Sequence, residues 1–319
     1  MNDMTSKHKK IYMIEFFRVF FVFFIILGHL MQSYPDVKNT IYSVVGSKLI
    51  PTWFCVELFS LIGGFLIYKK AILTDENIFS NIGHIYIRLL SAVLFFFAIA
   101  YILGITHLYN LPYVLSMTQG MSLGIADAIG WGDWFIGAYF WSITFCFVLL
   151  AYFKEKAFIF LVPMAFILLG LRYNHPYPGW MKAYSNCLGT EFSRVLSCVV
   201  LGTYSCFISE HLHIHHRHLN SFFFGLFEFY CIYWCFCHIL TDQMSPIAAI
   251  MCFCFLLIFG SKSAGFISKF LNKQSSIFYL SRYSFGIFLG VGMMQSLMLL
   301  HFSKLSSDVC SLVITGGVY

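Results

Sequence analysis

Charged residues are scarce in this chain. Only 11% of its 319 residues are Asp, Glu, Lys or Arg, whereas a soluble domain typically contains about 25%. Proline is also rare, with 7 residues, and no stretch rich in Pro, Ser or Gly marks a linker between soluble domains. Hydrophobic residues make up 59% of the chain. These features exclude an ordinary soluble protein and predict an all-α, polytopic transmembrane bundle formed by a single domain over residues 1–319.

Several familiar catalytic and metal-binding patterns are missing. The sequence has no P-loop, no G-x-S-x-G, no H-E-x-x-H and no C-x-x-C with usable spacing. Most of the 11 cysteines lie inside apolar runs, where a free thiol behaves as a small hydrophobic group. The histidine-rich run 211–218 is interpreted as a solvated loop at the membrane surface, with metal binding as the alternative. We therefore predict no metal, no disulfide framework and no nucleic-acid partner.

Long apolar runs predict nine transmembrane helices, and a short or interfacial tenth after Asp308. The expected spans are 13–32, 51–68, 84–103, 133–153, 157–171, 192–209, 220–240, 246–260 and 277–300. In this arrangement, Lys and Arg concentrate in the loops that lie on the same side of the membrane as the N-terminus. Because cytoplasmic loops carry an excess of basic residues, we predict a multi-pass protein of the cell (inner) membrane with a cytoplasmic N-terminus.

The first apolar run contains two ionisable residues, Arg18 and His29. Ionisable groups are costly in hydrocarbon, so each marks a candidate functional site. Eleven residues are close to three helical turns, which places both side chains on one face, roughly 16 Å apart along the axis. Glu15 lies one turn before Arg18 and is expected to form a structural ion pair with it. The alternative is that this pair only locks the helix and that His29 caps a neighbouring helix.

Glu57 is the second candidate, in the antiparallel second helix. Its height above the inner end of that helix, roughly 18 Å at 1.5 Å per residue, is comparable to the height of His29 in the first helix. A carboxylate beside an imidazole fixes its tautomer and raises its basicity, which suits a general base. We therefore predict His29 and Glu57 as a catalytic pair. The alternatives are that Glu57 is protonated or that it pairs with Lys48.

Two further arginines lie at expected inner helix starts, Arg88 in the third helix and Arg282 in the ninth. A guanidinium group there suits bidentate bonding to a phosphate. The alternative is a positive-inside anchor without a ligand. Together with the Lys69–Lys70 pair, these residues are predicted to form a basic rim that binds an anionic donor. Arg18 is predicted to contact the donor along the route from this rim toward His29.

Four segments in this order resemble the acyltransferase-3 family of integral membrane O-acyltransferases. They are the Arg18-x10-His29 element, C-V-E-L-F-S-L-I-G-G-F-L-I at Cys55–Ile67, G-D-W-F-I-G-A-Y-F-W-S at Gly132–Ser142, and L-S-R-Y-S-F-G-I-F-L-G-V-G-M at Leu280–Met293. The second segment has Gly63 where serine is common in the family. The resemblance implies a ten-helix membrane enzyme in which the motif histidine, here His29, is catalytic.

The resemblance also implies the reaction. Such an enzyme transfers an acyl group, usually acetyl, from cytosolic acyl-CoA to a sugar hydroxyl of a surface polysaccharide or its lipid-linked precursor. The expected partners are acyl-CoA, the glycan acceptor, membrane lipid and other proteins of glycan assembly. Two alternatives stay open: a transporter or flippase for a glycan or lipid, with Glu57, Glu228 and His238 lining a path, and a non-catalytic membrane scaffold of glycan assembly.

Overall fold

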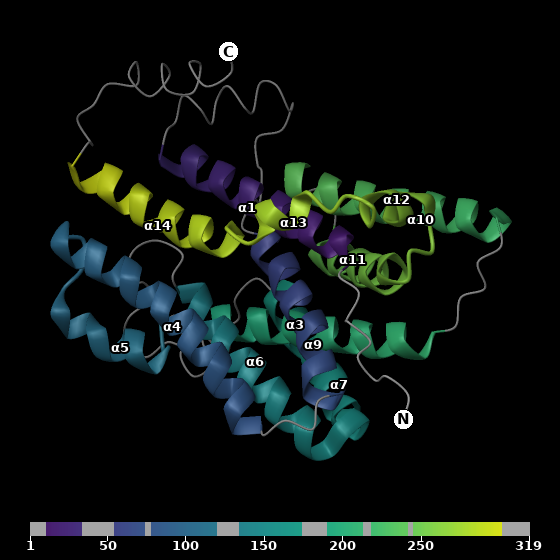
Figure 1. Ribbon diagram of the computed structural model, residues 1–319, viewed down its shortest axis with the longest axis horizontal. Helices are drawn as coiled ribbons and strands as arrows, with labels where there is room; N and C mark the ends of the chain where they lie inside the picture. Colours follow the sequence, from purple (N-terminus) through teal and green to yellow (C-terminus); the bar gives the residue numbers. More distant parts are fainter. Residues whose placement is uncertain are drawn as a thin grey trace, which may run out of the picture.

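A computed structural model describes residues 11–33, 54–73, 78–119, 134–173, 190–212, 218–241 and 245–301. Within these ranges the backbone consists of helices joined by turns and short bends, and it contains no strand. The predicted all-α helical bundle is confirmed for this part of the chain (Figure 1).

The helices lie where the apolar runs predict them. The long ones are α1 (Tyr12–Ser33), α3 (Cys55–Leu73), α4 (Ile78–Ile102), α6 (Trp134–Phe153), α7 (Phe158–Tyr173), α9 (Thr190–His211), α10 (His218–Thr241) and α11 (Pro246–Ser261). Short elements connect them: η2 (Leu108–Asn110), α5 (Leu111–Ser116), η3 (Lys154–Ala157) and α12 (Phe266–Leu271).

The expected span 277–300 is not one continuous helix. It is divided into α13 (Ile277–Ser281) and α14 (Ser284–His301). The Ser281 hydroxyl donates to the carbonyl of Phe278 at 3.0 Å, and the Ser284 hydroxyl donates to the carbonyl of Ser281 at 2.7 Å. Serine side chains that bond to nearby backbone carbonyls compete with the helix ladder. Two such serines, Ser281 and Ser284, flank the break at Arg282.

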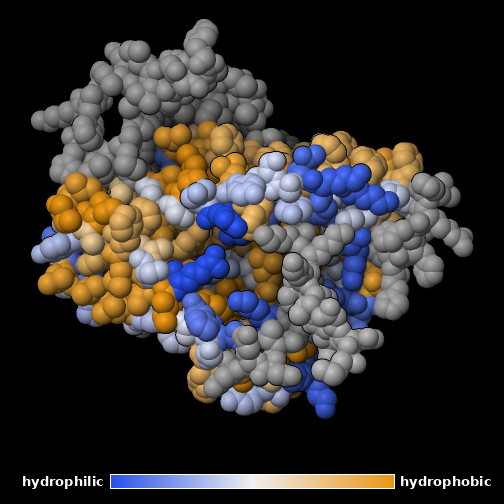
Figure 2. All heavy atoms as spheres, in the orientation of Figure 1, coloured by the Kyte–Doolittle hydropathy of each residue, from blue (hydrophilic) through white to orange (hydrophobic). Residues whose placement is uncertain are grey.

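The membrane character of the chain is confirmed. Five helical stretches of the described residues are long and apolar enough to cross a membrane: Tyr12–Met31, Ile78–Ile102, Trp134–Tyr173, Glu191–His211 and Ser221–Ile239. The third stretch contains both α6 and α7. Apolar residues cover much of the surface in Figure 2, and hydrophilic residues gather near the middle of the face shown.

The centre of the bundle is the pair of α3 and α9, which pack more closely than any other two helices of the described part. A Cβ atom built on Gly64 would overlap the carbonyl of Val199, and one built on Gly202 would overlap the carbonyl of Leu61. Small residues therefore let the two backbones touch, as is common where membrane helices meet. The two helices run parallel, because Glu57 lies against Arg194 near their starts and Tyr68 lies against Phe207 near their ends.

Helix α1 begins at the end of the bundle where α9 ends. The backbone N–H of Met13 donates to Oδ1 of Asn272 at 2.8 Å, and the Met13 side chain lies against Gly260 of α11. At the same end, the Ser209 hydroxyl of α9 lies 2.6 Å from the hydroxyl of Ser261. Because α9 and α3 are parallel, α1 runs antiparallel to α3, as predicted from the sequence.

Candidate functional site

A basic cavity of about 290 Å³ lies between α1, α3, α4, α6 and α14. Three cationic side chains line it, those of Arg18, Lys70 and Arg88. Along α3 the lining extends from Phe59 to Lys70, which corresponds to roughly 16 Å of helix. The lining along α3 therefore runs from Phe59, two residues after Glu57, to Lys70 near the end of the helix.

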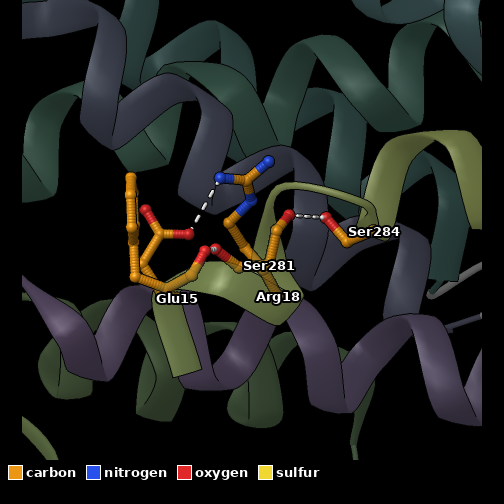
Figure 3. Close-up of polar contacts among 5 residues, drawn as sticks. Glu15, Arg18, Ser281 and Ser284 are labelled. Carbon is orange, nitrogen blue, oxygen red and sulfur yellow. Dashed lines mark hydrogen bonds and ion pairs between the residues drawn. The ribbon is translucent and has the colours of Figure 1, made fainter. Parts of the chain in front are cut away.

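Arg18 is held at the cavity by Glu15. Nη1 of Arg18 lies 3.0 Å from Oε2 of Glu15, one helical turn earlier, and the two side chains are only 21% and 14% exposed. The guanidinium carbon of Arg18 also lies 5.9 Å from the ring centroid of Phe59. Figure 3 shows the ion pair beside Ser281 and Ser284, at the break between α13 and α14. A single carboxylate leaves part of the guanidinium available to a second anion, since the group carries five N–H donors.

Gly63 makes room for a tyrosine in the cavity wall. A Cβ atom built on Gly63 would overlap the hydroxyl of Tyr139, which also lines the cavity. A serine at this position, common in the acyltransferase-3 family, would displace that phenol. The phenol of Tyr139 on α6 thus occupies the space that a side chain at Gly63 would fill.

Arg88 lies at the basic cavity, whereas Arg282 does not line it. Arg88 is exposed, and its side chain is part of the lining on α4. The guanidinium carbon of Arg282 lies 4.5 Å from the ring centroid of Phe278 and 5.9 Å from that of Tyr279. Of the predicted donor-binding residues, Arg18 and Arg88 line this cavity together with Lys70, and Arg282 lies at the α13–α14 break.

Glu57 is fully buried and belongs to a separate cluster. Its Oε1 lies 2.8 Å from Nε of Arg194 and accepts a hydrogen bond of 2.8 Å from the hydroxyl of Tyr173. The Arg194 guanidinium lies 5.0 Å from the ring centroid of Trp134. The cluster connects α3 to the neighbouring ends of α6, α7 and α9.

Sequence reasoning missed these partners of Glu57, having proposed His29 or Lys48. Lys48 lies outside the described residues. Arg194 follows the start of a membrane-length helix by one turn, which is the same signal that singled out Arg18. Applied to Arg194, that rule would have identified a third intramembrane cation in need of a carboxylate.

His29 is partly exposed and lies on the helix face of Arg18, about 20° away in projection. It is not part of the lining of the basic cavity. Because α1 and α3 are antiparallel, the three turns from Arg18 to His29 lead away from Lys70, in the direction of the end where α3 begins. The structure therefore brings Arg18 and Arg88 together on one cavity, whereas neither His29 nor Glu57 lines it.

Glu228, which the transporter alternative placed on a path, has a structural role. Its carboxylate accepts hydrogen bonds from the backbone N–H groups of Gly265 and Ser268, both at 3.0 Å, and from the Ser268 hydroxyl. The side chain is 1% exposed. Glu228 thus caps the start of α12 and ties it to α10.

Among the described residues no group of three or more His, Cys, Asp or Glu side chains could hold a metal ion. Residues 213–217 of the histidine-rich run lie outside them. In comparisons with known proteins, no family model, no curated protein and no solved structure matches the chain.

Proposed function

We propose that this protein is a membrane O-acyltransferase. It transfers an acyl group, typically acetyl, from cytosolic acyl-CoA to a sugar hydroxyl of a surface polysaccharide or its lipid-linked precursor. It resides in the cell membrane with a cytoplasmic N-terminus, so that the end of the bundle where α1 begins faces the cytosol. The resemblance of four sequence segments to the acyltransferase-3 family supports this reaction.

The basic cavity is the observation that carries the proposal. Acyl-CoA has phosphate groups at one end and a thioester at the end of a narrow arm. Arg18, Lys70 and Arg88 supply three positive charges to the wall of the cavity, and guanidinium groups bind phosphate with charge-assisted hydrogen bonds. The remainder of the lining is mainly apolar or aromatic and suits the uncharged arm. We assign donor binding to these three residues, with Arg282 as an outer contact.

His29 is the proposed general base. Its neutral imidazole removes the proton from an acceptor hydroxyl, whose oxygen attacks the thioester carbonyl. The new C–O ester bond forms, the C–S bond breaks, and the imidazolium returns the proton to the departing thiolate of CoA. This step requires the thioester to pass the aromatic residues of the cavity lining and to reach the outer part of α1.

Glu57 is the proposed partner of His29 and of the acceptor. Its Oε2 is buried and has no hydrogen-bond partner within the described part of the chain. In the proposed reaction this oxygen accepts a hydrogen bond from the incoming acceptor or from His29, while Oε1 stays with Arg194 and Tyr173. Glu57 is therefore proposed as the residue that positions the base and the alcohol.

Mass spectrometry of surface glycans from cells with and without this gene tests the function. We expect acyl groups on a glycan to disappear when the gene is deleted and to return with the intact gene. Purified protein in vesicles should consume acetyl-CoA in the presence of the acceptor. Movement of a glycan or lipid across the vesicle membrane without thioester cleavage would contradict the proposal and favour a transporter.

A further inference from the structure

A second concave surface, independent of the proposed reaction, lies between α10 and α11. Five phenylalanines line this open cleft of about 570 Å³: Phe223, Phe224, Phe227, Phe255 and Phe259. The rings form a connected aromatic wall, since the Phe259 centroid lies 5.1 Å from that of Phe224 and 5.8 Å from that of Phe227. We call this surface the phenylalanine cleft.

Two lysines lie one helical turn beyond the cleft, one near each of the two helices that form it. Lys262 follows Phe259 by three residues at the end of α11. On α10, Ser221 precedes Phe224 by three residues, and the ammonium of Lys269 donates to the Ser221 hydroxyl at 2.7 Å. Residues three apart on a helix share a face, so both positive charges lie at the same end of the cleft.

The position of Lys269 is fixed by the packing of α12 on α10. Glu228 holds the first turn of α12 through the N–H groups of Gly265 and Ser268. The ring of Phe266 occupies the space above Gly225, where a Cβ atom would overlap it. Asn272, which follows Lys269, donates to the carbonyl of Gly260 at 3.0 Å. Helix α12 is therefore held on both sides of Lys269, and its ammonium group is positioned beside Ser221.

The segment that follows α11 carries charge of one sign. Segment 262–282 contains the basic residues Lys262, Lys269, Lys273 and Arg282 and no Asp or Glu. The cleft itself lies on Ser221–Ile239, one of the stretches apolar enough to cross a membrane. A ligand that fits must therefore combine an anionic group with an apolar chain that runs along a membrane-facing helix pair.

We propose that the phenylalanine cleft binds an anionic phospholipid, with one acyl chain against the five rings and the phosphate between Lys262 and Lys269. Basic clusters at the end of membrane helices attract anionic lipid headgroups. The apolar rings supply the contact that retains one lipid molecule, since ammonium groups alone would attract any anion. The site distinguishes anionic from zwitterionic lipids through the net charge of the headgroup.

Native mass spectrometry of the full-length protein in detergent tests the site. Phosphatidylglycerol and phosphatidylcholine with identical acyl chains are titrated separately, and glycerol phosphate is added as a competitor without chains. We expect phosphatidylglycerol to bind more tightly, with an affinity that falls about fivefold in each of Lys262→Gln and Lys269→Gln. The double variant Phe227→Ala/Phe255→Ala should weaken the binding of phosphatidylglycerol without abolishing its preference over phosphatidylcholine.

Matched controls separate the cleft from the general surface. Lys156→Gln removes an exposed lysine of η3, and Phe229→Ala removes a ring of α10 that is 61% exposed and does not line the cleft. Both should bind phosphatidylglycerol as the unmodified protein does. Thermal unfolding without added lipid shows that each variant is folded.

Three results would overturn the proposal. One is equal binding of the two lipids. The second is equal loss in the control variants. The third is full displacement by glycerol phosphate, which would indicate a phosphate site without a lipid chain.

Discussion

Glu57 of α3 and Arg194 of α9 form a buried ion pair, with Oε1 2.8 Å from Nε and side chains that are 0% and 7% exposed. The pair lies where the two central helices begin and complements the close backbone contact farther along them. A buried charge is costly without a counter-charge, so the loss of one partner of a buried ion pair lowers stability strongly. This relationship makes Glu57 important for stability as well as for the proposed reaction.

Glu57→Gln should therefore destabilise the protein by about 3–5 kcal/mol, because the buried Arg194 guanidinium would lose the carboxylate with which it pairs. Thermal unfolding in detergent measures the change. The double variant Glu57→Gln/Arg194→Gln should recover part of the loss. Glu15→Gln serves as the control, because its pair with Arg18 is partly exposed and should cost about 1 kcal/mol or less.

Gly64→Ala should separate α3 from α9. The added methyl group would overlap the backbone carbonyl of Val199, which cannot move without its helix, and overpacking of this kind typically costs about 1–3 kcal/mol. Gly83→Ala is the matched control on α4, since no atom lies within 4 Å of a Cβ atom there. That variant should unfold at an unchanged or higher temperature. Similar behaviour of the two variants would contradict the close packing of the central helices.

Arg88→Gln should raise KM for acyl-CoA about tenfold to a hundredfold, the effect of losing a hydrogen bond to a charged group. The turnover of bound donor should change much less, because Arg88 is assigned to binding and not to proton transfer. Steady-state rates at several salt concentrations measure both quantities. Arg282→Gln should raise KM less, since its guanidinium lies over Phe278 and outside the cavity lining. An unchanged KM for Arg88→Gln would contradict the assignment of donor binding to this cavity.

Glu228→Gln should loosen α12. A glutamine has one acceptor oxygen in place of two, so the N–H groups of Gly265 and Ser268 cannot both be satisfied. We expect a loss of about 1–3 kcal/mol and faster hydrogen exchange at 265–271. The exposed Glu155 provides the control variant Glu155→Gln, which should leave that segment protected.

The helices themselves were predictable because each apolar run is long and few charges interrupt it. The break at Arg282 was not, since it accompanies hydroxyl groups that bond back to the preceding turn. A hydropathy pattern does not record such bonds. The pairing of Arg18 with Glu15 follows from local spacing on one helix and was expected from the sequence.

Contacts between distant helices were harder to predict. Glu57 and Arg194 lie far apart in the chain, and their meeting depends on Gly64 and Gly202, which set the register of α3 on α9. Arg88 and Arg18 share a cavity for the same reason: the register of three helices decides which charges face inward. The sequence predicted both as donor-binding residues, but Lys70 was only one of a pair of candidate lysines.

The central claim is that His29 is the general base of acyl transfer. Transfer of labelled acetyl from acetyl-CoA to the acceptor glycan in reconstituted vesicles, measured for His29→Ala and the unmodified protein, tests it most directly. A general base contributes about 10²–10⁴-fold, so we expect the variant to insert normally, bind donor normally and lose at least a hundredfold in rate. Transfer at the unmodified rate by correctly inserted His29→Ala would contradict the account.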